Sequence, residues 1–127
     1  MSVLSPAGAT LVKLMGEMPR GPRREGIFAL WLTLRMTEDL LLVPPQTERA
    51  VKRRVAALEQ RLSSLILPAP IRRALVSALT TLLEPGREQA ALVLQQLVAP
   101  AREALGAEAG EAVSKAARSA GQRVREG

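Results

Sequence analysis

The sequence predicts an all-α protein, a compact bundle of five to six helices joined by short connections that contain Pro or Gly. Two observations lead to this fold class. Apolar residues recur three and four positions apart along most of the chain, which is the spacing of one face of an α-helix. Prolines also mark the boundaries of these apolar segments, because proline is tolerated in the first turn of a helix and disrupts its interior. The prolines at or beside predicted helix ends are Pro6, Pro22, Pro45, Pro70 and Pro85, and Pro100 falls inside a predicted helix.

The first helix is predicted over residues 6–18. Ser5 can cap its N-terminus, and Pro6 then occupies the first helical position, where its missing N–H is not needed. Pro19 and Gly21 favour a turn after it. Its apolar residues at helical spacing are Leu11, Leu14, Met15 and Met18.

The second helix, residues 22–42, is predicted to be the central one. It contains most of the most apolar run of the chain, IFALWLTLRMTEDLLLV at residues 27–43, with the only Phe and the only Trp. A helix that is apolar on all sides is typically buried or crosses a membrane. Because Arg35, Glu38 and Asp39 interrupt the run, we predict a buried helix at the centre of the bundle.

The third and fourth helices are predicted from about residue 47 to 67 and from residue 70 to 83. The third begins at Thr47 as N-cap, or directly at Pro45. Its apolar residues alternate spacings of four and three, which predicts a seam that packs inside the bundle. These residues are Val51, Val55, Leu58, Leu62 and Leu65. The apolar stripe of the fourth helix is Ile71, Leu75, Ala78, Leu79 and Leu82.

The fifth helix is predicted over residues 87–105, with a kink or a break at Pro100 because proline removes one backbone hydrogen bond. Leu92 projects opposite its apolar stripe. Residues 107–127 are rich in Ala and hold few large apolar side chains. Three alternatives are consistent with this composition: a closely packed helix, a fraying tail or a segment ordered by a partner. We therefore expect a helical bundle domain over residues 1–106 and an Ala-rich C-terminal helix or tail over 107–127.

The composition argues against an enzyme. The chain has no His, Cys or Tyr, which excludes thiol nucleophiles, imidazole bases and the usual zinc sites. It also lacks phosphate-binding glycine loops and other catalytic motifs. We predict no catalytic, cofactor-binding or metal-binding residue and infer no small-molecule substrate.

Positive charge is concentrated in residues 44–83, although the net charge of the chain is only +6. Such a surface is a candidate for contact with anions or nucleic acid, an acidic protein partner or anionic lipid, but a solvated face is the favoured explanation. We see no aromatic residue on this face for base stacking, so only non-specific nucleic-acid binding is supported. The candidate residues are Arg49, Lys52, Arg53, Arg54, Arg61, Arg72 and Arg73.

For function we predict a non-enzymatic helical interaction or assembly module that binds a protein partner or self-associates. The apolar surface for this contact would lie on the second and fifth helices, with Trp31, Leu42 and Leu92 as candidate interface residues. The alternatives are a nucleic-acid-binding module that uses the basic surface of residues 49–73 and a protein associated with a membrane surface. We expect a cytoplasmic location.

Overall fold

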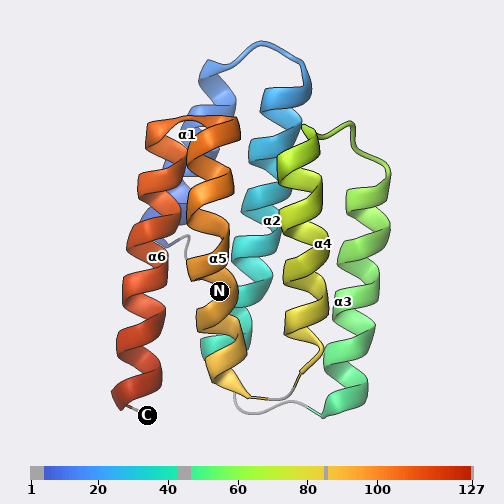
Figure 1. Ribbon diagram of the computed structural model, residues 1–127, viewed down its shortest axis with the longest axis vertical. Helices are drawn as coiled ribbons and strands as arrows, with labels where there is room; N and C mark the ends of the chain where they lie inside the picture. The colour runs from blue at the N-terminus through green and yellow to red at the C-terminus, as the bar shows by residue number, and fades with distance from the viewer. Residues whose placement is uncertain (1–4, 43–46, 85, 127) are drawn as a thin grey trace.

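The computed structural model describes residues 5–42, 47–84 and 86–126, apart from the side chain of Leu42. Over these residues it contains six α-helices and no strand, which confirms the predicted all-α bundle (Figure 1). The helices are α1 (Pro6–Glu17), α2 (Pro22–Leu42), α3 (Glu48–Ser63), α4 (Ala69–Leu82), α5 (Arg87–Leu105) and α6 (Ala107–Glu126).

The central position belongs to α2, which contacts each of the other five helices. In the view of Figure 1, α4 and α5 lie in front of α2, and α6 and α3 lie at the two sides. Ile27, Leu30 and Leu34 of α2 are fully buried in the core. Within the described chain, no helix is both long enough and apolar enough to cross a membrane.

Two helix N-termini are capped by the residues that the sequence predicts. The amide of Gly8 donates to Ser5 Oγ at 3.0 Å, which caps α1, and the amide of Ala50 donates to Thr47 Oγ1 at 3.1 Å, which caps α3. Each cap satisfies a backbone donor that the first turn leaves without a partner.

Reciprocal arginine contacts join α2 and α5, which run antiparallel. Arg23, at the start of α2, donates two hydrogen bonds to the carbonyl of Leu105 at the end of α5, at 3.3 and 3.0 Å. Arg87, at the start of α5, donates to the carbonyl of Leu41 near the end of α2 at 2.7 Å. Each arginine therefore binds a carbonyl that has no partner within its own helix, at the negative end of the helix dipole.

The last two helices form a close hairpin. α5 continues through Pro100 as one helix, so the proline does not divide it. Gly106, with φ +109°, makes the turn into α6. α6 packs against α5 through small residues, and a Cβ on Gly110 would lie 3.0 Å from the Cα of Arg102. The buried residues of α6 are Ala109, Gly110, Ala112, Val113, Ala116, Ala117 and Ala120.

Candidate functional site

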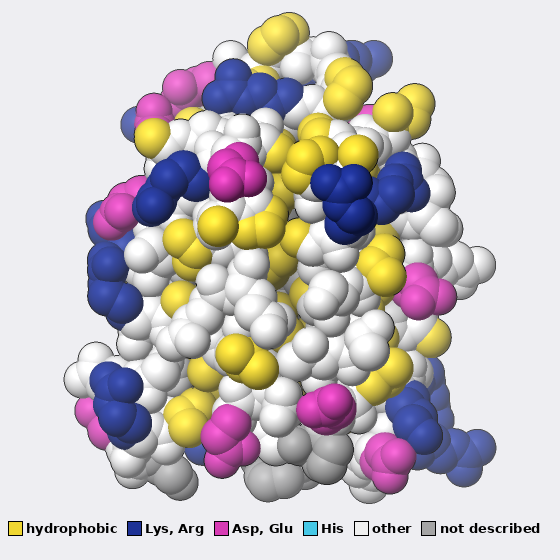
Figure 2. Space-filling view, viewed as in Figure 1, with side chains coloured by type: hydrophobic (Ala, Val, Ile, Leu, Met, Phe, Trp, Pro, Cys, Tyr) yellow, Lys and Arg dark blue, Asp and Glu magenta, His cyan; other side chains and the backbone are white. Residues whose placement is uncertain are grey.

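One face of the molecule, formed by α4 and α5, exposes a broad surface without charge. Residues 74–83 and 89–101 contain no Asp, Glu, Lys or Arg, although 24% of the chain is charged. Figure 2 shows the result: the middle of this face is white and yellow, and the charged side chains lie towards its edges. We call this surface the α4–α5 face. Its exposed side chains are Val76, Ser77, Thr80, Leu83, Leu92, Gln95, Gln96 and Ala99.

Three large apolar side chains of the α4–α5 face are exposed. Val76 is 60% exposed, and Leu83 and Leu92 are each 41% exposed. The remaining exposed groups are hydroxyls, carboxamides and the methyl group of Ala99, which can be buried in a contact at much lower cost than charges. The face is therefore suited to burial against another protein surface.

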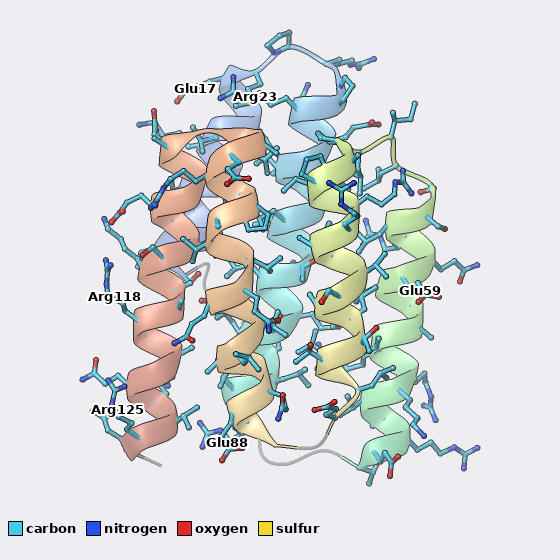
Figure 3. The ribbon with its side chains drawn as sticks, in the orientation of Figure 1. Glu17, Arg23, Glu59, Glu88, Arg118 and Arg125 are labelled. Atoms are coloured by element: carbon cyan, nitrogen blue, oxygen red, sulfur yellow. The ribbon has the colours of Figure 1, made fainter. Side chains whose placement is uncertain are left out.

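Along α4, the α4–α5 face ends in opposite charges, and α5 adds the exposed Glu103 at the end where Arg73 lies. Four residues with successive spacings of four, three and four lie on one side of α4 and of the two residues that follow it. They are Arg73, Ser77, Thr80 and Glu84. Arg73 lies at one end of this row and Glu84 at the other. Glu88, in the first turn of α5, adds a second carboxylate at the acidic end (Figure 3).

The three predicted interface residues do not lie together. Leu92 is on the α4–α5 face. Trp31 is partly buried elsewhere: its ring stacks on Phe28 with centroids 6.1 Å apart, and the Arg35 guanidinium lies 5.6 Å from its centroid. The side chain of Leu42 lies outside the described residues.

The predicted basic residues are divided among several intramolecular contacts. Arg54 forms an ion pair with Asp39 at 3.2 Å, and Lys52 forms one with Glu48 at 3.1 Å. Two further arginines are also engaged: Arg61 lies over the Phe28 ring at 5.8 Å, and Arg72 donates to the Leu65 carbonyl at 3.2 Å. Within the described chain, Arg49, Arg53 and Arg73 are exposed and make no hydrogen bond or ion pair.

The contact between Arg61 and Phe28 changes one expectation. The sequence indicated no aromatic residue beside the basic residues of α3, because Phe28 belongs to another helix. The structure brings the two together across the α2–α3 contact, as a cation–π pair. The guanidinium already covers the ring, so the pair stabilises the packing of α3 on α2.

A pocket of about 220 Å³ opens between the first turn of α1, the second half of α2 and the second half of α6. Its floor is apolar and its rim is charged. The apolar lining includes Trp31, Leu34, Leu41, Ala116 and Ala120, and the charged lining is Arg35, Glu38, Asp39, Lys115 and Arg123.

Glu38 is the titratable group most changed by this pocket. Burial raises the pKa of Glu38 above its usual value, and the neighbouring Asp39 carboxylate raises it further. A hydrogen bond from the Ser5 hydroxyl at 2.8 Å and the positive charge of Arg123 act in the opposite direction. The net effect favours the protonated acid, so burial outweighs the two favourable contacts.

This raised pKa makes folding stability depend on pH in a defined direction. Between the pKa of the unfolded chain and the higher pKa of the fold, the folded state holds more protons, so Glu38 makes stability fall as pH rises. Glu38→Gln keeps an oxygen that accepts from Ser5 and removes the titration. Urea unfolding from about pH 4 to 7 should show a flatter profile for this variant and a relative gain at neutral pH. Equal profiles for Glu38→Gln and the wild type would contradict the raised pKa, and Glu59→Gln at an exposed position is the matched control.

Sequence reasoning missed both the α4–α5 face and the pocket. The absence of charge in residues 74–83 and 89–101 is a signal that could have found the face. The pocket has no such signal, because it combines side chains from three helices that are far apart in the sequence.

No three His, Cys, Asp or Glu side chains gather as a metal site would need, within the residues that the structure covers. Comparisons of the chain with protein-family models, with curated proteins and with solved structures find no match.

Proposed function

We propose that this protein is a non-enzymatic assembly module that self-associates, with two copies packed through their α4–α5 faces. One observation carries the proposal: an uncharged, partly apolar surface that spans two helices and has opposite charges at the two ends of its α4 row. Interface cores are depleted in charged residues relative to the rest of a protein surface, as this face is. Exposed Val76 and Leu92 supply apolar area whose burial favours association.

A second copy fits this face because the face is complementary to itself. Arg73 and Glu84 lie at equal distances along the chain from the point between Ala78 and Leu79, in the second half of α4. When two copies meet about a two-fold axis through that point, their α4 helices run antiparallel. Arg73 of each copy then lies near Glu84 of the other, and the uncharged rows meet in the middle. Such rim pairs contribute mainly to orientation and specificity.

Nucleic-acid binding through residues 49–73 is less well supported. Four of the seven candidate cations, Lys52, Arg54, Arg61 and Arg72, already contact groups of the same chain. To bind phosphates, these residues would have to give up their contacts within the chain, which reduces the net free energy of binding.

The test is a charge placed at the centre of the α4–α5 face. We expect wild-type protein to form dimers in size-exclusion chromatography with light scattering, measured over a range of concentrations. Leu92→Glu should raise the dissociation constant at least tenfold, about 1.4 kcal/mol, because two carboxylates would be buried against an uncharged surface. Val12→Glu is the matched control: Val12 is 38% exposed, close to the 41% of Leu92, but lies on α1. A wild-type protein that stays monomeric at high concentration would overturn the proposal.

The same measurement assigns the orientation of the two copies. Arg73→Glu and Glu84→Arg should each weaken the dimer, because each places like charges opposite one another. An equimolar mixture of the two variants should form a heterodimer more readily than either variant dimerises alone, since both of its rims then carry opposite charges, one of them in reversed order. If the wild type dimerises and both variants dimerise with the same dissociation constant, the self-association would stand and the antiparallel arrangement would be wrong.

A further inference from the structure

The pocket between α1, α2 and α6 has the features of a small-molecule site. It shares no residue with the α4–α5 face, so it is independent of the proposed self-association. Leu34, Leu41 and Ala120 in its lining are almost completely buried. Ligand sites in proteins combine such an apolar lining with a few polar groups that fix the orientation of the ligand.

The carboxylates of this pocket are already engaged by groups of the protein. Asp39 accepts from Arg54 at 3.2 Å in an ion pair directed towards α3. Glu38 accepts from the Ser5 hydroxyl at 2.8 Å. Burial also raises the pKa of Glu38 above its usual value.

The cations of α6 are less occupied. Lys115 makes no hydrogen bond or ion pair within the described residues, and Arg123 interacts only through its charge with Glu38. Lys115, Ser119 and Arg123 stand four residues apart on α6 and all line the pocket. At 1.5 Å per residue, this row extends about 12 Å along the rim. It presents an ammonium, a hydroxyl and a guanidinium, which together suit an anionic oxygen group.

Trp31 adds a donor without an acceptor. Its indole Nε1 is buried and has no hydrogen-bond partner among the described residues, although Trp31 lines the pocket. Buried polar groups in proteins are nearly always hydrogen-bonded, because an unsatisfied one destabilises the fold. Because Nε1 is closed to solvent, Trp31 contributes apolar ring surface to the pocket, and Nε1 does not contact a ligand there.

We infer that this pocket binds small organic carboxylates that have a compact apolar body. The apolar body lies on the floor beside Trp31 and Leu34, and the carboxylate faces Lys115 and Arg123 on the rim. The volume of about 220 Å³ sets the size of the ligand. An apolar cavity of about 150 Å³ is enough for benzene, so this pocket has room for one ring with a short carboxylate chain.

The test uses 3-phenylpropanoate as the probe and its uncharged analogue 3-phenylpropanamide as the matched ligand. Trp31 is the only tryptophan of the chain, so its fluorescence reports on this pocket alone. Isothermal titration calorimetry supplies an independent dissociation constant. We expect the carboxylate to bind at least tenfold more tightly than the amide, and inorganic phosphate to bind at least tenfold more weakly than the carboxylate.

Variants of α6 connect the binding to the rim. Lys115→Ala and Arg123→Ala should each weaken carboxylate binding at least fivefold and leave amide binding unchanged. Arg118→Ala is the matched control, because Arg118 projects from the outer side of α6 and does not line the pocket (Figure 3). All three positions are exposed, so these variants should retain the fold, which circular dichroism checks.

Each remaining outcome overturns the inference. Equal dissociation constants for the carboxylate and the amide would show that Lys115 and Arg123 do not contribute to binding. Equal dissociation constants for phosphate and the carboxylate would show that the apolar floor does not contribute. No change in Trp31 fluorescence and no heat at tens of millimolar carboxylate would exclude the site.

Discussion

Replacing Leu30 with Ala is expected to destabilise the protein by about 2–5 kcal/mol, the range seen when a buried Leu is truncated in a packed core. Leu30 is completely buried in α2, the helix that contacts all the others. The substitution removes apolar contacts and leaves a cavity that several helices would have to move to fill. Urea unfolding measures the loss as a lower transition midpoint at an unchanged slope.

Val12→Ala provides the control for this measurement. Val12 is 38% exposed on α1, and truncation of an exposed side chain usually changes stability by no more than about 0.5 kcal/mol. A loss below about 1 kcal/mol for Leu30→Ala would show that α2 is not the centre of the core.

Gly110→Ala is expected to destabilise the protein by about 1–3 kcal/mol through overpacking of the α5–α6 hairpin. The added Cβ would lie 2.7 Å from the Cβ of Arg102 and 3.0 Å from its Cα. Neither atom is the end of a flexible side chain, so the two helices would have to separate. The clash exceeds the gain in helix propensity, which favours Ala over Gly by about 1 kcal/mol. Thermal or urea unfolding reports the difference.

Gly121→Ala makes the same chemical change on the same helix with the opposite expected sign. A Cβ at Gly121 would make only an ordinary contact, 3.6 Å from Nη1 of Arg125. The Ala should therefore stabilise α6 by up to about 1 kcal/mol. If Gly110→Ala and Gly121→Ala changed the free energy of unfolding in the same direction, close packing at Gly110 would not explain the effect of Gly110→Ala.

The fold was predictable because its elements are specified locally. Ser5 and Thr47 act as N-caps within three residues of the amides that they accept from, so their role is readable from a short stretch of sequence. The apolar stripes depend on spacings of three and four residues, which are equally local. Pro100 was harder to interpret, because whether a helix bends or breaks at proline depends on the packing around it.

The candidate sites were less predictable because they depend on contacts between helices. Arg54 and Arg61 were grouped with the basic face of α3 from their sequence positions, but both turn towards α2. The pocket requires Trp31, Glu38 and Arg123 to meet, and nothing in the sequence between them indicates that α6 returns alongside α2. Side-chain chemistry is readable from the sequence, whereas its convergence requires the tertiary structure.

The reciprocal contacts of Arg23 and Arg87 have a consequence for the growing chain on the ribosome. Arg23 donates to the carbonyl of Leu105, and α5 buries one side of α2. These contacts cannot form until residue 105 has been synthesised. The 63 residues from Leu42 to Leu105 take roughly 3–13 s at about 5–20 residues per second. During that interval the most apolar segment of the protein has been made and its cover has not. Completion of the fold is therefore tied to the synthesis of α5.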